Sequence, residues 1–256
     1  MIMSQIKQRG YSRYNLMEDL FYEGIEFDLK EITDYFKDLP KDEYAPNLNR
    51  YRRYSRAIIL PNTNNIFWLP TIEESGKSYS AYFQGKFNPE HPGAYRKFYS
   101  IDQRILDNKL LQTIILQDYK ETFWSEEDKI LPIHVGVHFV KLNVKEKSDK
   151  AVSSPNCLHQ DGEPFTFAHL IERKNVKGGV NVIAQPHNAG YTPEQISEEE
   201  IIEEFEINKA LESYGVHDPD VSHYVSPIEL DEEDGEGVRS VLLIDYQLTV
   251  VADVDE

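Results

Sequence analysis

The chain has 256 residues and carries 45 acidic against 27 basic side chains, a formal net charge of −18 that argues against nucleic acids and anionic membranes as partners. It has no apolar run of about 18 residues that could span a membrane, and its N-terminus lacks the apolar segment of a secretory signal. The single cysteine, Cys157, cannot form an internal disulfide, so we expect a protein of the reducing cytoplasm.

The first part of the chain has the patterns of both helices and strands. Asp28 and Glu31 have the spacing of a helix start, and Pro40 would end that helix. A second helix is predicted to follow Asp102 or Asp107, because apolar residues recur there every three to four positions. Between the helices, short apolar runs predict strands at 57–60 and 66–69.

From about residue 130 the pattern becomes that of strands. Apolar side chains occupy alternate positions from Ile133 to Phe139 and then resume in the opposite phase at Val140, which predicts a β-bulge at 139–140. Further apolar strands are expected at 165–171, 179–184 and 241–251.

Two acidic regions interrupt these strands. Thr192, Pro193 and Gln195 have the pattern of a capped helix start, and we interpret the acidic run 198–206 behind it as a solvated surface face. The second region, 231–236, contains glycine and is predicted to be an exposed loop between strands.

Strands that follow an initial helical part predict a mainly β fold with flanking α-helices. We expect its core to be a distorted double-stranded β-helix, that is, a jelly roll of the cupin-like kind. We predict a single domain of residues 1–256, in which 1–125 form a mixed helical and strand elaboration and 126–256 form the core with the metal site. The hydrophobic fraction of 40% is sufficient for a core of this size.

His159 and Asp161 are the most informative residues of that core. On an extended segment, side chains two residues apart point to the same face, so both could reach one metal ion. Two imidazoles and one carboxylate are typical of a ferrous iron site with open coordination positions, and His223 is the natural third ligand. A surface histidine and aspartate in a loop are the alternative. Other histidines are further alternatives for the third position: His134, His138, His169, His187 and His217.

Arg239 stands out by its charge. From Glu194 onward the chain has twenty acids but only Lys209 and Arg239 as cations. Arg239 opens an apolar strand, and a buried arginine without an anionic partner is destabilising. Two interpretations follow from the sequence. Arg239 could form a salt bridge with a nearby acid, or its guanidinium fork could bind a planar dicarboxylate.

Upstream, four arginines lie within the seven residues Arg50 to Arg56. Strand alternation would place Arg50, Arg52, Tyr54 and Arg56 on one side, where one arginine could hold a substrate carboxylate and the others could pair with acids. Further polar residues that suit a small amphiphilic ligand, with ordinary packing as their alternative, are Tyr82, Gln84 and Arg96.

In order and spacing, these segments resemble the 2-oxoglutarate/Fe(II)-dependent dioxygenases of the bacterial isoleucine-4-hydroxylase type. The resemblance covers roughly residues 50–250. It is carried by 153–164, 167–170, 178–181, 223–228 and 239–243, and upstream by 53–56, 82–84 and 96–101. Many members of the wider superfamily carry the arginine closer to the distal histidine. Here Arg239 lies sixteen positions after His223, a spacing similar to that of the isoleucine-hydroxylase branch, and the acidic loop fills the gap.

The resemblance implies that His159, Asp161 and His223 hold Fe(II) and that Arg239 binds the far carboxylate of 2-oxoglutarate. It implies hydroxylation of a free aliphatic amino acid or close analogue by O2, with succinate and CO2 as co-products and ascorbate as the reductant in vitro. The substrate carboxylate needs a cation, and the candidates for it are Arg56 and Arg96. Tyr82 and Gln84 are the other residues expected to contact substrate.

Three other functions are compatible with the same residues. The oxidant could desaturate or cyclise an amino acid instead of hydroxylating it. A cupin-like enzyme could bind zinc or nickel at the same ligands, and Arg239 would then be only structural. A non-catalytic acidic binding module with a decayed site is the third, but intact His159, Asp161, His223 and Arg239 argue against decay.

Overall fold

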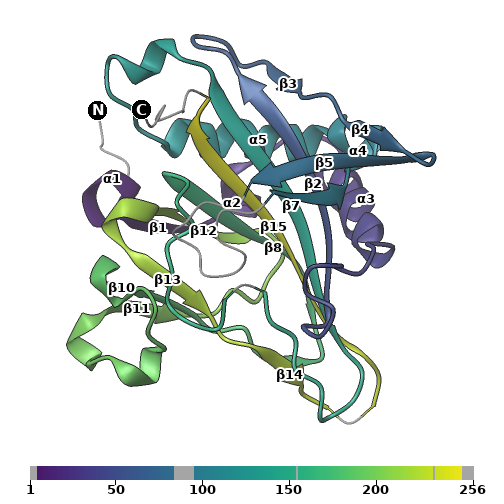
Figure 1. The fold of residues 1–256 in the computed structure, drawn as a ribbon, viewed down its shortest axis with the longest axis vertical. Helices are drawn as coiled ribbons and strands as arrows, with labels where there is room; N and C mark the ends of the chain where they lie inside the picture. The colour runs from purple at the N-terminus through teal and green to yellow at the C-terminus, as the bar shows by residue number, and fades with distance from the viewer. Residues whose placement is uncertain (1–4, 84–94, 154, 233, 250–256) are drawn as a thin grey trace.

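The computed structural model describes residues 5–83, 95–153, 155–232 and 234–249 (Figure 1). Its main element is a seven-stranded antiparallel sheet in the order β1-β12-β8-β15-β7-β2-β3. In that order, the strands are Tyr11–Asn15, Glu212–His217, Phe165–Lys174, Gly237–Leu248, Ile133–Val144, Arg50–Ile59 and Ile66–Trp68.

Three smaller sheets accompany the large one. The first has the order β11 (Ile201–Phe205), β10 (Asn181–Ala184) and β13 (Ser222–Val225). In the second, β14 (Ile228–Leu230) pairs with β9 (Val176–Gly178). The third has the order β4 (Ile72–Glu74), β5 (Lys77–Phe83) and β6 (Tyr95–Tyr99).

Helices cover one face of the large sheet, and the sheet β11-β10-β13 packs against the other. Figure 1 shows that small sheet at the lower left, away from α3 and α5. The helices are α1 (Gln5–Arg9), α2 (Leu16–Asp19), α3 (Ile25–Lys37), α4 (Gln103–Leu106) and α5 (Lys109–Glu121). Short 3-10 turns are η1 (Asp128–Ile130), η2 (Pro186–Asn188), η3 (Pro193–Gln195), η4 (Glu198–Glu200) and η5 (Asp218–Asp220). The mainly β, jelly-roll-like fold with flanking helices is therefore confirmed.

Because both faces of the large sheet are covered, its long strands are buried on both sides. On β15, Leu242 and Ile244 pack against the helices, while Leu243 and Asp245 point to the opposite face. This explains the change of apolar phase near Val140 on β7. The predicted β-bulge at 139–140 is wrong, since β7 pairs with β2 and β15 in unbroken register there.

Two predicted helix starts also need correction. The helix assigned to Asp28 begins earlier, at Ile25, and Gly24 occupies its N-cap with a left-handed φ of 96°. The predicted helix after Thr192 is only the 3-10 turn η3, although the Gln195 side chain does accept from the Thr192 backbone N–H at 2.8 Å. The acidic run behind it forms η4 and the strand β11, because Ile201 and Phe205 turn towards the protein.

The second predicted helix is confirmed as the pair α4 and α5. Asp102 is the N-cap of α4, and the Asn108 side chain caps α5 by accepting from two backbone N–H groups. The last strand, β15, begins at Gly237, ahead of the predicted Val241. The division of the chain at residue 125 stays a prediction. Within the described ranges, no helix is long and apolar enough to cross a bilayer.

A buried polar network joins the helices to the sheet. His169 lies between Ser213 and Asp118 with ring-nitrogen contacts of 2.9 Å to each, and the Tyr14 hydroxyl donates to Asp118 at 2.9 Å. Ser213 donates its own hydrogen to the Leu211 carbonyl, so it accepts from His169 Nδ1–H. Asp118 and the Nε2 of His169 must then share one further proton. Burial raises the pKa of Asp118, which is fully enclosed.

We expect Asp118→Ala to lower the free energy of unfolding by about 3–5 kcal/mol, because it leaves His169 and Tyr14 with unpaired buried groups. Urea denaturation measures this loss. Lys120→Ala, an exposed position of the same helix, is the control and should stay within about 0.5 kcal/mol of the parent. A loss below about 1 kcal/mol for Asp118→Ala would contradict the structural role of the network.

Candidate metal and cosubstrate site

The site is built where two chain segments pair through a single isolated bridge. His159 and His223 exchange both backbone hydrogen bonds, at 3.0 and 2.9 Å. His223 belongs to β13 and pairs on its other side with Ile183 of β10. Because paired residues of antiparallel strands point their side chains the same way, the two imidazoles lie together, with ring centroids 4.3 Å apart.

Asp161 is positioned by the turn η5. Both oxygens of the Asp218 carboxylate accept backbone N–H groups, from Asp161 at 2.9 Å and from Gly162 at 2.8 Å. The Gln160 side chain donates to the Asp218 carbonyl at 2.6 Å. These bonds fix the segment of the chain that carries Asp161 in front of the two histidines.

The structure thus brings the three predicted ligands together. One ligand atom from each of His159, Asp161 and His223 lies within 4.8 Å of the others, and the Nε2 atoms are 3.5 and 3.3 Å from the Asp161 oxygens. His159 Nδ1 bonds the Cys157 carbonyl at 3.0 Å, which only a protonated nitrogen can do, so its Nε2 lone pair faces the cluster. His223 Nε2 is buried without a hydrogen-bond partner among the described residues.

This donor set fits a divalent metal. Neighbouring ligand atoms of a metal bound at about 2.1 Å are roughly 3 Å apart, close to the separations found. Burial alone would raise the pKa of Asp161, but attraction to His223 and contacts with both histidines outweigh it and hold that pKa well below its usual range. Burial alone would lower the pKa of His223, but Asp161 raises it. The carboxylate is therefore ionised and ready to bind a cation.

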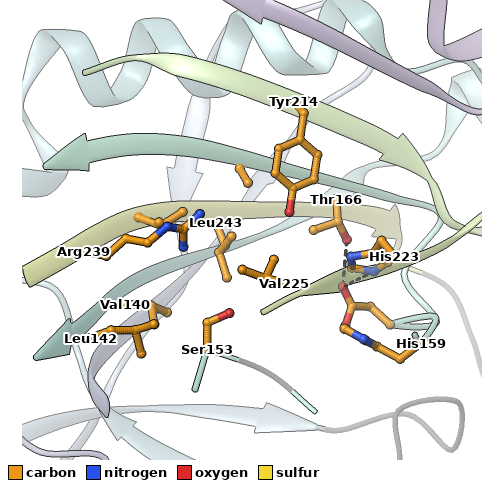
Figure 2. A pocket seen from close by; sticks show the side chains of 13 residues that line it. Val140, Leu142, Ser153, His159, Thr166, Tyr214, His223, Val225, Arg239 and Leu243 are labelled. Carbon is orange, nitrogen blue, oxygen red and sulfur yellow. Dashed lines mark hydrogen bonds and ion pairs between the residues drawn. The ribbon is translucent and has the colours of Figure 1, made fainter. Parts of the chain in front are cut away.

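A narrow cavity of about 70 Å³ extends from the cluster across the large sheet. Figure 2 shows His159 and His223 at one end, Arg239 at the other, and the Tyr214 hydroxyl pointing in between them. On the scale where one water needs about 10–15 Å³, this is room for several atoms. The walls between the two ends are mostly apolar, with Ser153 and Thr166 as polar exceptions; the apolar residues are Val140, Leu142, Val225, Val241 and Leu243.

Arg239 is only 2% exposed, yet it forms no ion pair with any described residue, and its Nε has no hydrogen-bond partner there. A salt bridge, the first of the two interpretations that the sequence allows for Arg239, is therefore not found in the part of the chain that the structure describes. Burial lowers the pKa of Arg239 to about 10, and burial raises the pKa of Tyr214 to about 12. Gly179, with a left-handed φ of 70°, packs its backbone on Arg239, and a Cβ there would lie 3.0 Å from Nε.

A second cavity of about 70 Å³ adjoins the first and shares Asp161, Thr166 and Leu243 with it. Its other walls are strongly polar: Arg50, Arg52, Tyr82, Arg96, His138, Glu163 and Asp245. We call it the polar chamber. A third and much larger cavity, of about 740 Å³, is lined by Arg56 and also reaches Asp161.

The predicted substrate residues are distributed over these spaces. Tyr82 and Arg96 line the polar chamber, and Tyr82 also lines the large cavity together with Arg56. Arg50, Arg52, Tyr54 and Arg56 share one side of β2, as strand alternation predicts. Gln84 lies outside the described residues.

Several residues of the site were not predicted. Asp245 is the only charged residue within the buried run 241–246, and that isolation was a usable signal. Glu163 and Asp218 lie close to the metal residues in space, but acids are so frequent in this chain that neither stands out. Nothing in the sequence distinguishes Tyr214 from the other tyrosines.

Matches to known proteins extend over most of the chain. A family model described as 2OG-Fe dioxygenase matches residues 33–245. The L-isoleucine-4-hydroxylase of Bacillus thuringiensis is 31% identical over 222 residues, which cover 83% of this chain and 80% of that relative. The 3(1)-hydroxy-L-isoleucine 4-dioxygenase of Pantoea ananatis is 27% identical over 225 residues, 86% of this chain and 81% of the relative.

Solved structures share the fold at lower identity. The crystal structure of IDO from Bacillus thuringiensis has a TM-score of 0.70 at 23% identity and covers 96% of both chains. A bsmA homolog from Methylobium petroleophilum PM1 has a TM-score of 0.76 at 13% identity, covering 96% of this chain and 91% of the other. The Fe(II)/(alpha)ketoglutarate-dependent dioxygenase TqaL has 0.73 at 12%, covering 99% and 88%.

We expect Asp218→Ala to weaken divalent-metal binding by about 10- to 100-fold, because the carboxylate that orients the Asp161 segment is lost. Titration with Mn²⁺ measures this affinity. Asp218→Asn keeps one accepting oxygen and should fall between Asp218→Ala and the parent. Asp220→Ala, in the same turn but exposed and bonded to His217, is the matched control. Equal metal affinities for Asp218→Ala and Asp220→Ala would rule out the positioning role.

Proposed function

The chain belongs to the family of 2OG-Fe dioxygenases, and we propose that it hydroxylates an unactivated C–H bond of a free aliphatic amino acid. Enzymes of this family use Fe(II), 2-oxoglutarate and O2. The two relatives named for isoleucine and a hydroxylated isoleucine support the substrate class. One observation carries the proposal: a cavity with the metal cluster at one end and the buried Arg239, which has no ion-pair partner among the described residues, at the other.

We assign His159 Nε2, a carboxylate oxygen of Asp161 and His223 Nε2 as the iron ligands. Bound iron and 2-oxoglutarate supply the chemistry that activates O2 and inserts one oxygen atom into a C–H bond, with release of succinate and CO2. The protein's own part is to hold these ligands rigidly. The His159–His223 bridge and the Asp218 carboxylate do this through backbone hydrogen bonds that do not depend on the metal.

Arg239 is assigned to the far carboxylate of 2-oxoglutarate, with the Tyr214 hydroxyl as a second donor. A guanidinium binds a carboxylate through two parallel N–H bonds, so Arg239 fixes both the position and the plane of that group. The apolar walls formed by Val225, Val241 and Leu243 fit the methylene carbons and exclude water. A dicarboxylate would also supply the counter-charge that Arg239 lacks within the described residues.

The substrate is assigned to the side of Asp161 that faces away from Arg239. Arg96 and Tyr82 line the polar chamber there and remain our candidates for contact with it. Arg56 lies in the larger cavity and is a candidate for a more distant contact. The apolar wall of Val140 and Leu243, which both small cavities share, would face the hydrocarbon part of the substrate.

The deciding experiment measures succinate release with Fe(II), ascorbate and 2-oxoglutarate over a panel of free amino acids, with products identified by mass. We expect succinate formation coupled to the gain of one oxygen atom, first of all with L-isoleucine and its analogues. Loss of two hydrogens would change the outcome to desaturation or ring closure within the same family. Iron-loaded protein that couples succinate release to no amino acid would refute the substrate class.

The cosubstrate assignment predicts the effects of two substitutions. Arg239→Ala should raise the KM for 2-oxoglutarate by at least about 30-fold, because a buried charge partner is lost. Tyr214→Phe should raise it by about tenfold, as expected for one hydrogen bond to a charged group. Tyr224→Phe, whose hydroxyl bonds Asn156, is the matched control and should leave that KM unchanged. An unaltered KM in Arg239→Ala would overturn the assignment.

A further inference from the structure

The polar chamber contains charges of both signs that the metal site does not use. Its cations are Arg50, Arg52 and Arg96, and its acids beyond Asp161 are Glu163 and Asp245. Arg50 is already neutralised, because its Nε lies 2.8 Å from the buried Asp42 carboxylate. The remaining question is how the other charged groups of this small space are balanced.

Arg52 is held in place without being neutralised. Its guanidinium carbon lies 4.3 Å from the centre of the Phe98 ring, and its NH2 group bonds His138 Nδ1. Since arginine can only donate, His138 Nδ1 accepts, and the ring proton sits on Nε2, which donates to Asp245 at 2.8 Å. A neutral imidazole therefore separates the cation from the acid. Arg52 forms no ion pair with a described residue.

Arg96 lies beside Arg52 over the same aromatic cluster. Its guanidinium carbon is 5.1 Å from the Tyr82 ring and 5.3 Å from the Phe98 ring. Arg96 is only 2% exposed, although its side chain lines the chamber. Stacking on an aromatic face leaves the edge of the Arg52 guanidinium, with its remaining N–H donors, available to a ligand. Arg96 adds a second positive charge to the same wall.

The two acids are buried, and contacts with His138 and Gly136 hold Asp245 in place. Asp245 lies opposite Gly136 in the register of β15 and β7, and a Cβ at Gly136 would overlap the Asp245 carboxylate. Glycine is thus required for the carboxylate to lie across the sheet. Glu163 is only 7% exposed, and neither it nor Asp245 pairs with a lysine or arginine in the described part of the chain. Among the described residues, therefore, no lysine or arginine forms an ion pair with either acid.

We propose that the polar chamber binds both charged groups of an amino-acid substrate, its carboxylate at Arg52 and Arg96 and its ammonium at Glu163 and Asp245. This inference rests on the proposed function and deepens it. A carboxylic acid without the amine would leave the acids without a counter-ion, and an amine without the carboxylate would leave Arg52 without one. The chamber is therefore specific for a free amino acid, and it discriminates against one that is joined to a carrier or a peptide through either end.

The chamber's size agrees with this assignment. About 70 Å³ is room for a head group of a few atoms. Tyr82, Asp161 and Glu163 also line the cavity of about 740 Å³, so discrimination against a carrier or a peptide rests on the charges of the chamber and not on its volume. Asp161, Thr166 and Leu243 line both small cavities, so a side chain that leaves the chamber along this wall comes directly to the metal cluster. The head group would then fix which carbon is presented.

The test is a set of binding measurements with three probes: L-isoleucine, L-isoleucinamide, and 2-hydroxy-3-methylpentanoate. Each is titrated by calorimetry into the protein loaded with Fe(II) and 2-oxoglutarate without O2, so that no turnover occurs. In the parent protein, removal of either charged group should weaken binding by about 100-fold or more. Equal affinities for the three probes would overturn the proposal outright.

Variants test the carboxylate contact and the ammonium contact separately. Arg52→Ala should reduce the preference for the acid over the amide at least about tenfold and leave the preference for the amino over the hydroxy compound. Glu163→Gln should do the reverse. Arg52→Lys keeps the charge and guards against misfolding, and thermal unfolding checks each variant. Arg53→Ala is the matched control, because Arg53 bonds Ser100 and Asp102 outside the chamber.

These outcomes separate the two proposals. If no amino acid drives succinate release, the proposed function fails. If L-isoleucine is hydroxylated but Arg52→Ala and Glu163→Gln, both folded, keep the parent's preferences, only the head-group assignment fails. If the turnover panel identifies a substrate other than isoleucine, the three binding probes are that amino acid, its amide and its 2-hydroxy acid.

Discussion

The single bridge between His159 and His223 is the contact on which the site depends. Two backbone hydrogen bonds join a loop to β13 and turn two imidazoles towards one point. Asp161 follows two residues later and is held by Asp218 from the turn just before β13. All three side chains are thus fixed by one short stretch of pairing, so the cluster is preorganised by the backbone.

The large sheet supplies most of the other charged residues of the site, among them Arg52, Arg239 and Asp245. Helices cover one face of the sheet with an apolar layer. The opposite face, towards β11-β10-β13, can therefore bury arginine, histidine and aspartate. Such burial is costly unless each charge has a partner. Arg50 finds its partner within the protein, and His138 is kept neutral, with a pKa lowered to about 4 by burial and by Arg52. Arg239 finds none among the described residues, which marks where a ligand must supply the opposite charge.

The sequence predicted the parts of this arrangement that have local signals. Alternation gave the strands and the shared side of Arg50, Arg52 and Arg56, and the motif order indicated a family that the comparisons confirm. What it could not provide is pairing between distant segments. The apparent bulge near Val140 is an ordinary strand with two covered faces, and no local pattern reveals which element covers each face. Tyr214 belongs to the site for the same reason, through contacts distant in sequence.

A single strand relates the two ligand positions. Arg239 and Asp245 lie on the same face of β15, six residues apart, which corresponds to about 20 Å along the strand. Between them Leu243 lines both small cavities, as Asp161 does. The strand therefore sets the separation between Arg239, the proposed anchor of the cosubstrate, and Asp245, the proposed ammonium-binding acid. Because side chains alternate with a period of two, a one-residue slip of β15 would turn both anchors to the helical face at once. The unbroken pairing of β15 with β7 through twelve residues excludes that slip, so the register of one strand pair positions both proposed anchors.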